Sequence, residues 1–277
     1  VLLASVLLSR RSGTWLSVSK VGLPARQLRR QAVLFGDSIT QQAHATGKGE
    51  AGWAASLANH LVRRVDVLNR GYSGFNTRQA LALLPKIFPK PLEGEERLLF
   101  ATIFFGANDA AGADERVPNE LQHVPLSEYE ANLGRIVRHV SACCEHVILI
   151  APPPVDSQRW PDRSNAAVER YGAAARRVAA QEGVSFVDSY AEFTGSKRKF
   201  HELTNDGLHL SGLGNSVVWG ALLRVLPPAI QKPMGPQGLG IDFPEWRDVS
   251  PSNPEQSLED AAAGKLPYPC RLDTKQK

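Results

Sequence analysis

Short runs of apolar and β-branched residues alternate with longer segments along most of this 277-residue chain. The apolar runs are residues 32–35, 65–68, 98–105, 146–150 and 184–187, and the helix-length segments are residues 53–64, 77–84, 127–144, 164–182 and 213–226. Such runs of apolar and β-branched residues indicate strands buried on both faces, and several of the longer segments begin with Ser or Thr, which cap helices. The alternation predicts an α/β chain, a three-layer α/β/α sandwich of flavodoxin-like type around a five-stranded, mostly parallel sheet.

The hydrophobic content, 43% of all residues, is sufficient for one domain with a sizeable core. We place that domain at residues 31–250. Residues 1–30 form an N-terminal extension that contains no acidic residue. From Pro227 onward, Pro, Gly and polar residues replace the regular apolar pattern. The sequence therefore predicts an irregular or disordered tail at residues 251–277.

The formal net charge of +4 does not indicate a nucleic-acid-binding surface. Six of the 32 basic residues precede the first acidic residue, Asp37, and the others nearly balance the 28 acidic residues. Nucleic-acid-binding domains need basic residues clustered on the folded body, and none are evident here. We therefore expect no nucleic acid among the partners, and the sequence leaves a homodimer open as the assembly.

Three cysteines, two of them adjacent, and no Asn-x-Ser/Thr sequon favour an intracellular location over secretion. The first eight residues are apolar, but a helix needs about 20 such residues to span a bilayer, so we expect no transmembrane segment. The Arg- and Ser-rich extension fits the remains of a transit or signal peptide, or an extension without a function. The expected location is cytoplasmic, or organellar (mitochondrion or plastid) if the extension is a transit peptide.

Four short motifs place reactive side chains at regular points of this pattern. They are residues 36–40 (GDSIT), 69–77 (NRGYSGFNT), 106–109 (GAND) and 206–209 (DGLH). The first three follow apolar runs, and open parallel sheets bind ligands beyond the carboxyl ends of their strands. We therefore expect Ser38, Gly74 and Asn108 at one edge of the sheet, with His209 reaching them from the segment before the last helix.

Ser38, His209 and Asp206 are the residue types of a serine nucleophile, its base and a carboxylate. A serine hydroxyl needs a nearby histidine that takes its proton, and the histidine is normally oriented by a carboxylate. Because only two residues separate Asp206 from His209, both can come from one loop or first helical turn. These three residues are the candidate catalytic residues.

The candidate oxyanion hole consists of Ser38, Gly74 and Asn108. The tetrahedral intermediate of acyl transfer carries a negative oxygen, which needs hydrogen-bond donors fixed in advance. The Ser38 amide would lie at a helix N-terminus, Asn108 offers a side-chain amide, and Gly74 has no Cβ that would keep an oxyanion away. Asp37 is expected to accept backbone hydrogen bonds and so shape the turn, and Arg78 to order the glycine loop.

These motifs, in this order, resemble those of the SGNH or GDSL hydrolases, and most closely their isoamyl acetate-hydrolysing esterase branch. The closer resemblance is carried by residues 101–110 (ATIFFGANDA) and 203–209 (LTNDGLH), and the whole of it runs from residue 32 to about residue 249. It implies an SGNH hydrolase fold in which Asp206 and His209 supply the triad. It also implies that the oxyanion glycine is Gly74 rather than Gly71.

The resemblance further implies a serine esterase that hydrolyses short-chain, acetate-type carboxylic esters through an acyl-enzyme. The substrate would be a small-molecule ester, and neither a metal nor a cofactor is expected. A carbohydrate O-deacetylase or a lysophospholipase is the alternative, because the pocket walls set the acyl length and the leaving group. In this branch a Trp-Arg-Asp segment closes the folded body, so Trp246 is expected to pack down.

Other interpretations fit the motifs less well. Residues 47–52 match the glycines of a dinucleotide-binding loop but do not directly follow a strand, and position 40 lacks the glycine of the Gly-x-Ser-x-Gly motif of α/β-hydrolases. A metal-dependent phosphoesterase would use Asp37, Asp109, Asp206 and His209, yet these motifs contain only one histidine. A non-catalytic binding module would be expected to lack the serine, the histidine or an oxyanion donor.

Overall fold

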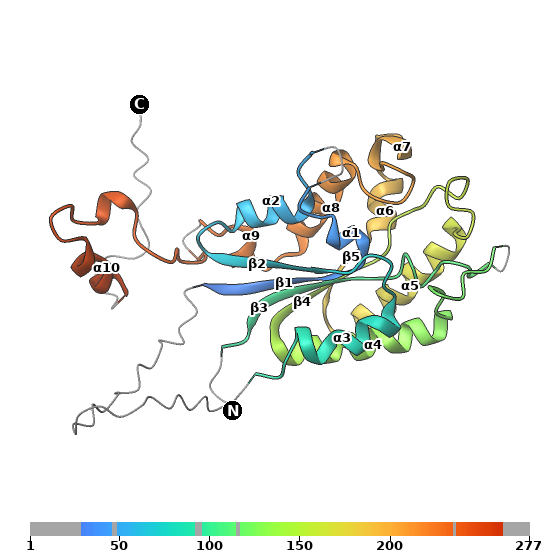
Figure 1. The fold of residues 1–277 in the computed structure, drawn as a ribbon, viewed down its shortest axis with the longest axis horizontal. Helices are drawn as coiled ribbons and strands as arrows, with labels where there is room; N and C mark the ends of the chain where they lie inside the picture. The colour runs from blue at the N-terminus through green and yellow to red at the C-terminus, as the bar shows by residue number, and fades with distance from the viewer. Residues whose placement is uncertain (1–28, 46–48, 92–95, 115–116, 235–236, 263–277) are drawn as a thin grey trace, which may run out of the picture.

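The computed structural model describes residues 29–45, 49–91, 96–114, 117–234 and 237–262 (Figure 1). Its strands are β1 (Arg30–Gly36), β2 (Val65–Gly71), β3 (Leu98–Phe104), β4 (Cys144–Ile150) and β5 (Ser185–Val187). They form a sheet in the order β2-β1-β3-β4-β5, and every pairing is parallel. The predicted five-stranded α/β fold is confirmed, and the sheet is parallel throughout rather than mostly parallel.

Burial on both faces explains the apolar composition of the central strands. Residues 32–36 of β1 and 99–104 of β3 are all buried, although successive side chains point to opposite sides of the sheet. Phe35 meets the rings of Phe88 and Phe105 edge to face, at centroid separations of 5.6 and 4.9 Å. Such ring pairs contribute about 1 kcal/mol each beyond the burial of their area. The strands that precede Ser38 and Asn108 are therefore anchored in the buried core.

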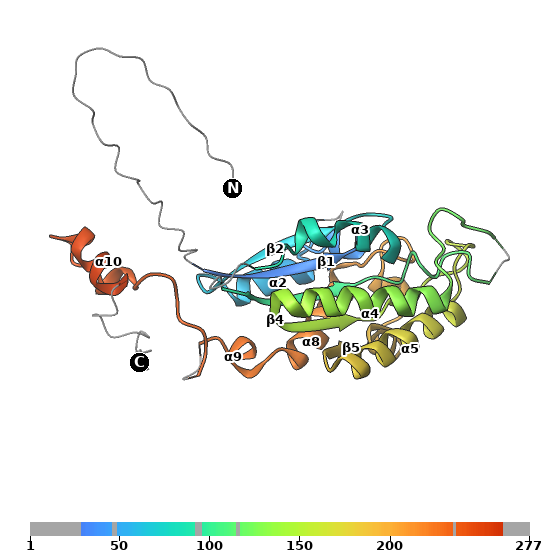
Figure 2. The same cartoon turned by 90° about the horizontal axis from the view of Figure 1, so that it is seen from below.

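Helices cover both faces of the sheet (Figure 1, Figure 2). They are α1 (Ser38–Gln41), α2 (Trp53–His60), α3 (Thr77–Ile87), α4 (Leu126–Cys143), α5 (Asn165–Glu182), α6 (Ser189–Thr194), α7 (Phe200–Leu203), α8 (Gly212–Val225), α9 (Pro228–Gln231), the 3-10 helix η1 (Trp246–Asp248) and α10 (Pro254–Ala262). Helices α3, α4 and α5 pack together on one face, and α2 and α8 on the other, which gives the predicted three layers. Among the described residues, no helix combines the length and the apolar composition of a membrane span.

Helices α3, α5 and α8 begin close to where the sequence places them, and a polar side chain caps the first turn of each. Asn76 caps α3 in a capping box with Gln79, and the Ser164 side chain caps α5. Helix α2 ends at His60 rather than at residue 64. The reason is the left-handed backbone of Arg63, with φ of 62°, which turns the chain into β2.

Strand β1 begins at Arg30, one residue before the predicted start of the domain at residue 31. The Arg30 guanidinium lies 2.6 Å from the Glu145 carboxylate of β4, an ion pair that extends the strand beyond its apolar part. Residues 1–28, which make up most of the predicted extension, lie outside the described residues.

The tail after residue 250 is not irregular throughout, because α10 occupies Pro254–Ala262. Asn253 accepts a hydrogen bond from the N–H of Gln256, and the Glu, Gln and Ala residues that follow favour a helix. The expectation that Trp246 packs down is also wrong, since it is 76% exposed. Asp242 and Glu245, which precede Trp246, form ion pairs with Arg63. These pairs hold the C-terminal segment to the domain at a point before the tryptophan.

Candidate active site

Ser38 is the first residue of α1 and follows the carboxyl end of β1 after a sharp turn. Asp37 caps this short helix, because its Oδ1 accepts a hydrogen bond of 2.9 Å from the N–H two residues later, as predicted. Gly36 makes the turn possible, since a Cβ there would lie 2.1 Å from Thr40 Oγ1 and 2.7 Å from the Phe104 carbonyl oxygen. Backbone packing at this turn thus fixes where Ser38 lies.

Three loops with candidate residues leave the sheet from neighbouring strands at the same level. Gly36, at the end of β1, pairs in register with the last residues of β2 and β3. Ser38, Gly74 and Asn108 lie two, three and four residues beyond this row. The structure therefore brings these predicted residues to one edge, where the chain departs from β1 toward both sides of the sheet.

His209 and Asp206, in the loop between α7 and α8, complete a chain of hydrogen bonds that ends at Ser38. The distance from His209 Nε2 to Ser38 Oγ is 3.0 Å, and His209 Nδ1 lies 2.7 Å from Asp206 Oδ2. An ionised carboxylate only accepts hydrogen bonds, so this network assigns the ring proton to Nδ1 and leaves Nε2 to accept the serine hydrogen. The fold thus joins two side chains that are 171 positions apart.

Asp206 is held in place by the loop that contains it. Its Oδ1 accepts hydrogen bonds from the N–H groups of Leu208 and His209, at 3.0 and 2.8 Å, and the intervening Gly207 has φ of 89°. Burial acts to raise the pKa of Asp206, but the hydrogen bonds from His209 and Leu208 outweigh it and leave the pKa below its ordinary value. The carboxylate is therefore charged at neutral pH and able to orient an imidazole.

The loop after β2 distinguishes Gly74 from Gly71. The Gly71 N–H already donates to Asn69 Oδ1 at 2.8 Å. Within the described part of the chain, the N–H groups of Gly74 and Ser38 donate to no other residue. Gly74 also has φ of 80°, a backbone conformation that favours glycine. Of the two glycines, Gly74 is therefore the one with an N–H available to a bound oxygen.

The orientation of the Asn108 side-chain amide is fixed by three hydrogen bonds. Its Oδ1 accepts from Arg163 Nη2 at 3.0 Å and from Gln122 Nε2 at 3.1 Å, while its Nδ2 donates to the Phe75 carbonyl at 2.9 Å. The side chain is buried. One Nδ2 hydrogen remains for a further acceptor, so Asn108 can supply a third donor beside Ser38.

Gln122, Trp160 and Arg163 belong to this site, although the sequence reasoning does not predict them. Trp160 Nε1 donates to the backbone oxygen of Asp206 at 3.1 Å, and the Trp160 ring lies edge-on to that of His209 at 6.0 Å. Trp160 and Arg163 both come from the loop between β4 and α5, at the same edge of the sheet as the other loops. That position after a strand is the signal that could have identified them.

The first turn of α3 is held by acidic residues from neighbouring segments. Asp109 Oδ1 accepts hydrogen bonds from Thr77 N at 3.0 Å and Thr77 Oγ1 at 2.5 Å. Arg78 binds the Glu128 carboxylate of α4 through two nitrogens, at 2.5 and 2.6 Å. Arg78 therefore joins α3 to α4, whereas we expected it to order the glycine loop.

Two buried carboxyl groups, Asp37 and Asp109, lie behind the candidate nucleophile. Burial raises the pKa of Asp37 to about 7, although the Ile39 N–H acts against the rise. Burial likewise raises the pKa of Asp109 to about 7 against the hydrogen bonds from Thr77. In the unfolded chain both groups would have the ordinary pKa of 3.8. The folded state therefore binds more protons than the unfolded state between about pH 4 and pH 7.

Because of these two groups, the free energy of unfolding should contain a contribution that falls as pH rises from about 4 to 7. Asp109→Asn keeps an oxygen for Thr77 and removes one of the two titrations. In urea unfolding at pH 5 and pH 7.5, we expect wild type to lose about 2 kcal/mol relative to this variant over that interval. A stability difference that is the same at both pH values would contradict the assignment.

The ligand set of the phosphoesterase interpretation is not assembled in the structure. Asp37 binds the Ile39 N–H of its own turn, Asp109 binds Thr77 at the start of α3, and Asp206 binds His209. Among the described residues, no group of three or more His, Cys, Asp or Glu side chains is close enough together to hold a metal ion.

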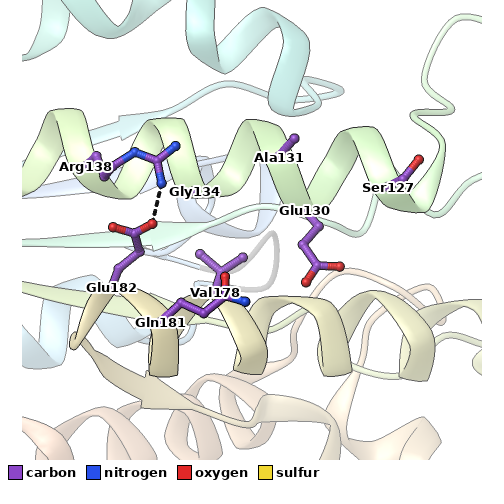
Figure 3. Close-up of a pocket in the computed structure, with 8 residues that line it drawn as sticks. All are labelled: Ser127, Glu130, Ala131, Gly134, Arg138, Val178, Gln181 and Glu182. Carbon is purple, nitrogen blue, oxygen red and sulfur yellow. Dashed lines mark hydrogen bonds and ion pairs between the residues drawn. The ribbon is translucent and has the colours of Figure 1, made fainter.

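A surface hollow of about 320 Å³ lies between α4 and α5 (Figure 3). Eight residues line it, namely Ser127, Glu130, Ala131, Gly134, Arg138, Val178, Gln181 and Glu182. Ion pairs cross it, including one between Arg138 and Glu182. None of the candidate active-site residues lines this hollow, so it is separate from the Ser38 site.

Comparison with known proteins decides the family. A model of the GDSL-like lipase/acylhydrolase family matches residues 34–217, which is more than half of the chain. The chain belongs to this family. The SGNH or GDSL resemblance drawn from the four motifs is thereby confirmed, and so is the prediction that the protein is a carboxylic ester hydrolase.

Individual members of this GDSL family extend the match. The isoamyl acetate-hydrolyzing esterase 1 homolog of Rattus norvegicus is 41% identical over 241 residues, which cover 82% of this chain and 91% of that protein. The lipase/acylhydrolase structure from Enterococcus faecalis is 29% identical with a TM-score of 0.56, and the match covers 70% of this chain and 94% of that one. The resemblance to the isoamyl acetate-hydrolysing branch is therefore confirmed at the level of sequence.

Another similar protein of known structure is the acetylxylan esterase Axe2 from Geobacillus stearothermophilus. It is 26% identical with a TM-score of 0.57, and the match covers 70% of this chain and 93% of that one. Axe2 structures include catalytic mutants in which a serine, an aspartate, or a histidine three positions after that aspartate is replaced by alanine. In this chain, Asp206 and His209 have the same spacing.

Proposed function

We propose that this protein is a serine esterase that hydrolyses short-chain, acetate-type carboxylic esters through an acyl-enzyme. The observation that carries the proposal is the chain of hydrogen bonds from Ser38 Oγ to His209 at 3.0 Å and on to Asp206 at 2.7 Å. This chain ends at the sheet edge that also holds the Asn108 amide and the N–H groups of Ser38 and Gly74, which donate to no other described residue. A nucleophile, its base and fixed donors are the parts that acyl transfer requires.

In the first step, Ser38 Oγ attacks the ester carbonyl carbon while its proton passes to His209 Nε2. The carbonyl π electrons move to the oxygen, which becomes an oxyanion. The N–H groups of Ser38 and Gly74 and the free Nδ2 hydrogen of Asn108 stabilise this charge. Asp206 stabilises the imidazolium that forms.

In the second step, the tetrahedral intermediate collapses and the carbon–oxygen bond to the alcohol breaks. His209 returns its proton to the departing alcohol, and the acyl group stays on Ser38 Oγ. A water molecule then gives a proton to His209 and attacks the acyl carbon. Collapse of this second intermediate breaks the bond from the acyl carbon to Ser38 Oγ and releases the carboxylic acid. His209 gives its proton to Ser38 Oγ, which restores the hydroxyl.

The names of the relatives support an acetate-type ester as the substrate. Isoamyl acetate and acetylated xylan differ in the alcohol but share the acetyl group. A carbohydrate O-deacetylase remains the second candidate, and the likeness to Axe2 favours it over a lysophospholipase. A homodimer, and the absence of cofactors and of nucleic-acid partners, stay predictions from the sequence.

A panel of p-nitrophenyl esters from C2 to C12, with acetylated xylose and xylo-oligosaccharides in parallel, tests the substrate class. We expect kcat/KM to be highest for the acetyl ester and to fall by roughly 10-fold or more by C8. The reason is that a pocket shaped for a short acyl group discriminates against added methylenes by about 1–3 kcal/mol. EDTA should leave the rates unchanged.

Three outcomes would replace the proposal with an alternative. A maximum at C8 to C12 would indicate a lipase-like or lysophospholipase activity, and a strong preference for acetylated sugars would indicate the deacetylase. A folded protein that turns over no ester at all would support the non-catalytic binding module.

A further inference from the structure

The loop between β4 and α5 places a buried cation directly behind the proposed oxyanion site. Arg163 is 5% exposed. Its Nη2 donates to Asn108 Oδ1 and to Gln122 Oε1, each at 3.0 Å, and its Nε donates to the Ala107 carbonyl at 3.3 Å. Its Nη1 binds both oxygens of Asp162. Arg163 therefore uses one nitrogen for its counter-ion and turns the other two toward the loop that carries Asn108.

The hydrogen bonds to Asn108 Oδ1 set the direction and the donor strength of Asn108 Nδ2. Because Oδ1 accepts from both Arg163 and Gln122, a flipped amide would set its NH₂ group against two donors. A hydrogen bond from a guanidinium is charge-assisted. In a buried site, such a bond to the amide oxygen also draws electron density away from the amide nitrogen. The remaining Nδ2 hydrogen is thereby fixed in direction and made more positive.

Burial of an arginine is costly, so its retention here calls for a reason. A buried ion pair is often no more stable than apolar residues of similar size, and it is weak support for a purely stabilising role. Burial acts to lower the pKa of Arg163, while Asp162 acts to raise it. The ion pair with Asp162 offsets part of the cost of desolvating Arg163. The other guanidinium N–H groups donate to the Ala107 carbonyl and to Asn108 Oδ1, so the positive charge lies next to the proposed oxyanion donor.

The same loop also supports the other half of the site. The Arg163 guanidinium lies over the Trp160 ring at 4.9 Å, and Trp160 Nε1 donates to the Asp206 carbonyl at 3.1 Å. The Asp156 N–H donates to the carbonyl of Gly207 at 2.8 Å. The loop between β4 and α5 thus contacts both Asn108 and the segment that carries Asp206 and His209. A test of Arg163 must therefore separate an effect on the oxyanion donor from an effect on the base.

We propose that Arg163 is a positioning residue that orients and polarises the Asn108 amide for the oxyanion, with Gln122 as the second donor to the same oxygen. The proposal rests on the proposed esterase function. Arg163 should stabilise the transition state more than the bound substrate, because negative charge develops on the substrate oxygen only during the reaction and the ground-state carbonyl carries little charge.

The decisive measurement is steady-state kinetics with p-nitrophenyl acetate for Asn108→Ala, Arg163→Met and the double variant. We expect kcat to fall about 100- to 1,000-fold for Asn108→Ala and about 10- to 100-fold for Arg163→Met, with KM changed less than about threefold. If Arg163 acts through Asn108, the double variant should be within about threefold of Asn108→Ala alone. Arg163→Lys keeps the charge and should recover part of kcat.

A second readout distinguishes polarisation from loss of structure. A trifluoromethyl ketone forms an oxyanion adduct with the serine, so its Ki should rise in Arg163→Met in parallel with the fall in kcat. The Ki of an uncharged carbonyl analogue such as acetamide, which forms no oxyanion adduct, should stay nearly the same. Arg170→Met, which removes an exposed arginine of α5, is the matched control and should keep wild-type kcat.

Thermal unfolding shows which variants fold. If Arg163→Met does not fold, Asp162→Asn/Arg163→Met, which removes both charges of the pair, takes its place in the comparison. A folded variant without the Arg163 guanidinium that keeps kcat within twofold of wild type, or multiplicative losses in the double variant, would overturn the inference. Unchanged kcat in Asn108→Ala would instead overturn the oxyanion role assigned under the proposed function. An impaired Asn108→Ala beside a normal Arg163→Met rejects the role of Arg163 only.

Discussion

Ser38→Ala should lower kcat for p-nitrophenyl acetate by at least about 10,000-fold, because no other group can form the acyl-enzyme. Ser38 Oγ is the atom that lies 3.0 Å from His209 Nε2. Alanine leaves this nitrogen without its partner, while His209 Nδ1 stays bound to Asp206. The remaining oxyanion donors would still bind substrate, so KM should change little. The measurement is the steady-state rate at saturating substrate.

The fold of the Ser38→Ala variant should be intact. The Ser38 side chain makes its hydrogen bond to His209, whereas the turn around it is held by Asp37 and Gly36. Ser216→Ala removes an exposed hydroxyl from α8 and is the matched control that should retain full activity. A folded Ser38→Ala variant within 10-fold of the wild-type rate would contradict the assignment of the nucleophile.

Asp206→Asn should lower kcat by about 1,000- to 10,000-fold with the loop preserved. The asparagine Oδ1 can still accept the N–H groups of Leu208 and His209, so the turn loses none of its hydrogen bonds. Its NH₂ group, however, would meet His209 Nδ1 as a donor. The imidazole would then hold its proton on Nε2, the atom that has to accept the proton of Ser38.

Asp206→Ala is the informative comparison, because it removes the orienting oxygen and the cap of the loop together. It should be no more active than Asp206→Asn and less stable to heat. An Asp206→Asn variant within 10-fold of wild type would show that backbone contacts, such as the one from Trp160 to the carbonyl of Asp206, suffice to orient His209.

Most of the fold was predictable, because the buried parts of β1, β3 and β4 are almost entirely apolar. The elements that the sequence did not predict are short or lie outside the core. Helices α6, α7 and α9 have four to six residues, too few for a periodic pattern, and α10 depends on local capping rather than on an apolar face. The start of β1 extends to Arg30 because of an ion pair across the sheet, which strand patterns do not reveal.

The candidate site was predictable to a similar degree, and for a comparable reason. Ser38, Gly74 and Asn108 each stand a few residues after a strand, so a parallel sheet has to bring them to one edge. Arg163 and Trp160 also follow a strand, but no local pattern distinguishes them from other polar or aromatic loop residues. Their role comes from contacts with residues about 50 positions away, which only the folded chain shows.

The most direct test of the central claim is the reaction of the folded protein with a fluorophosphonate, followed by mass spectrometry. The account predicts one adduct per chain, formed as fluoride leaves the phosphorus, on the peptide that contains Ser38, and none in Ser38→Ala. Wild-type protein that hydrolyses acetate esters yet forms no adduct, or forms it equally in Ser38→Ala, would contradict the account.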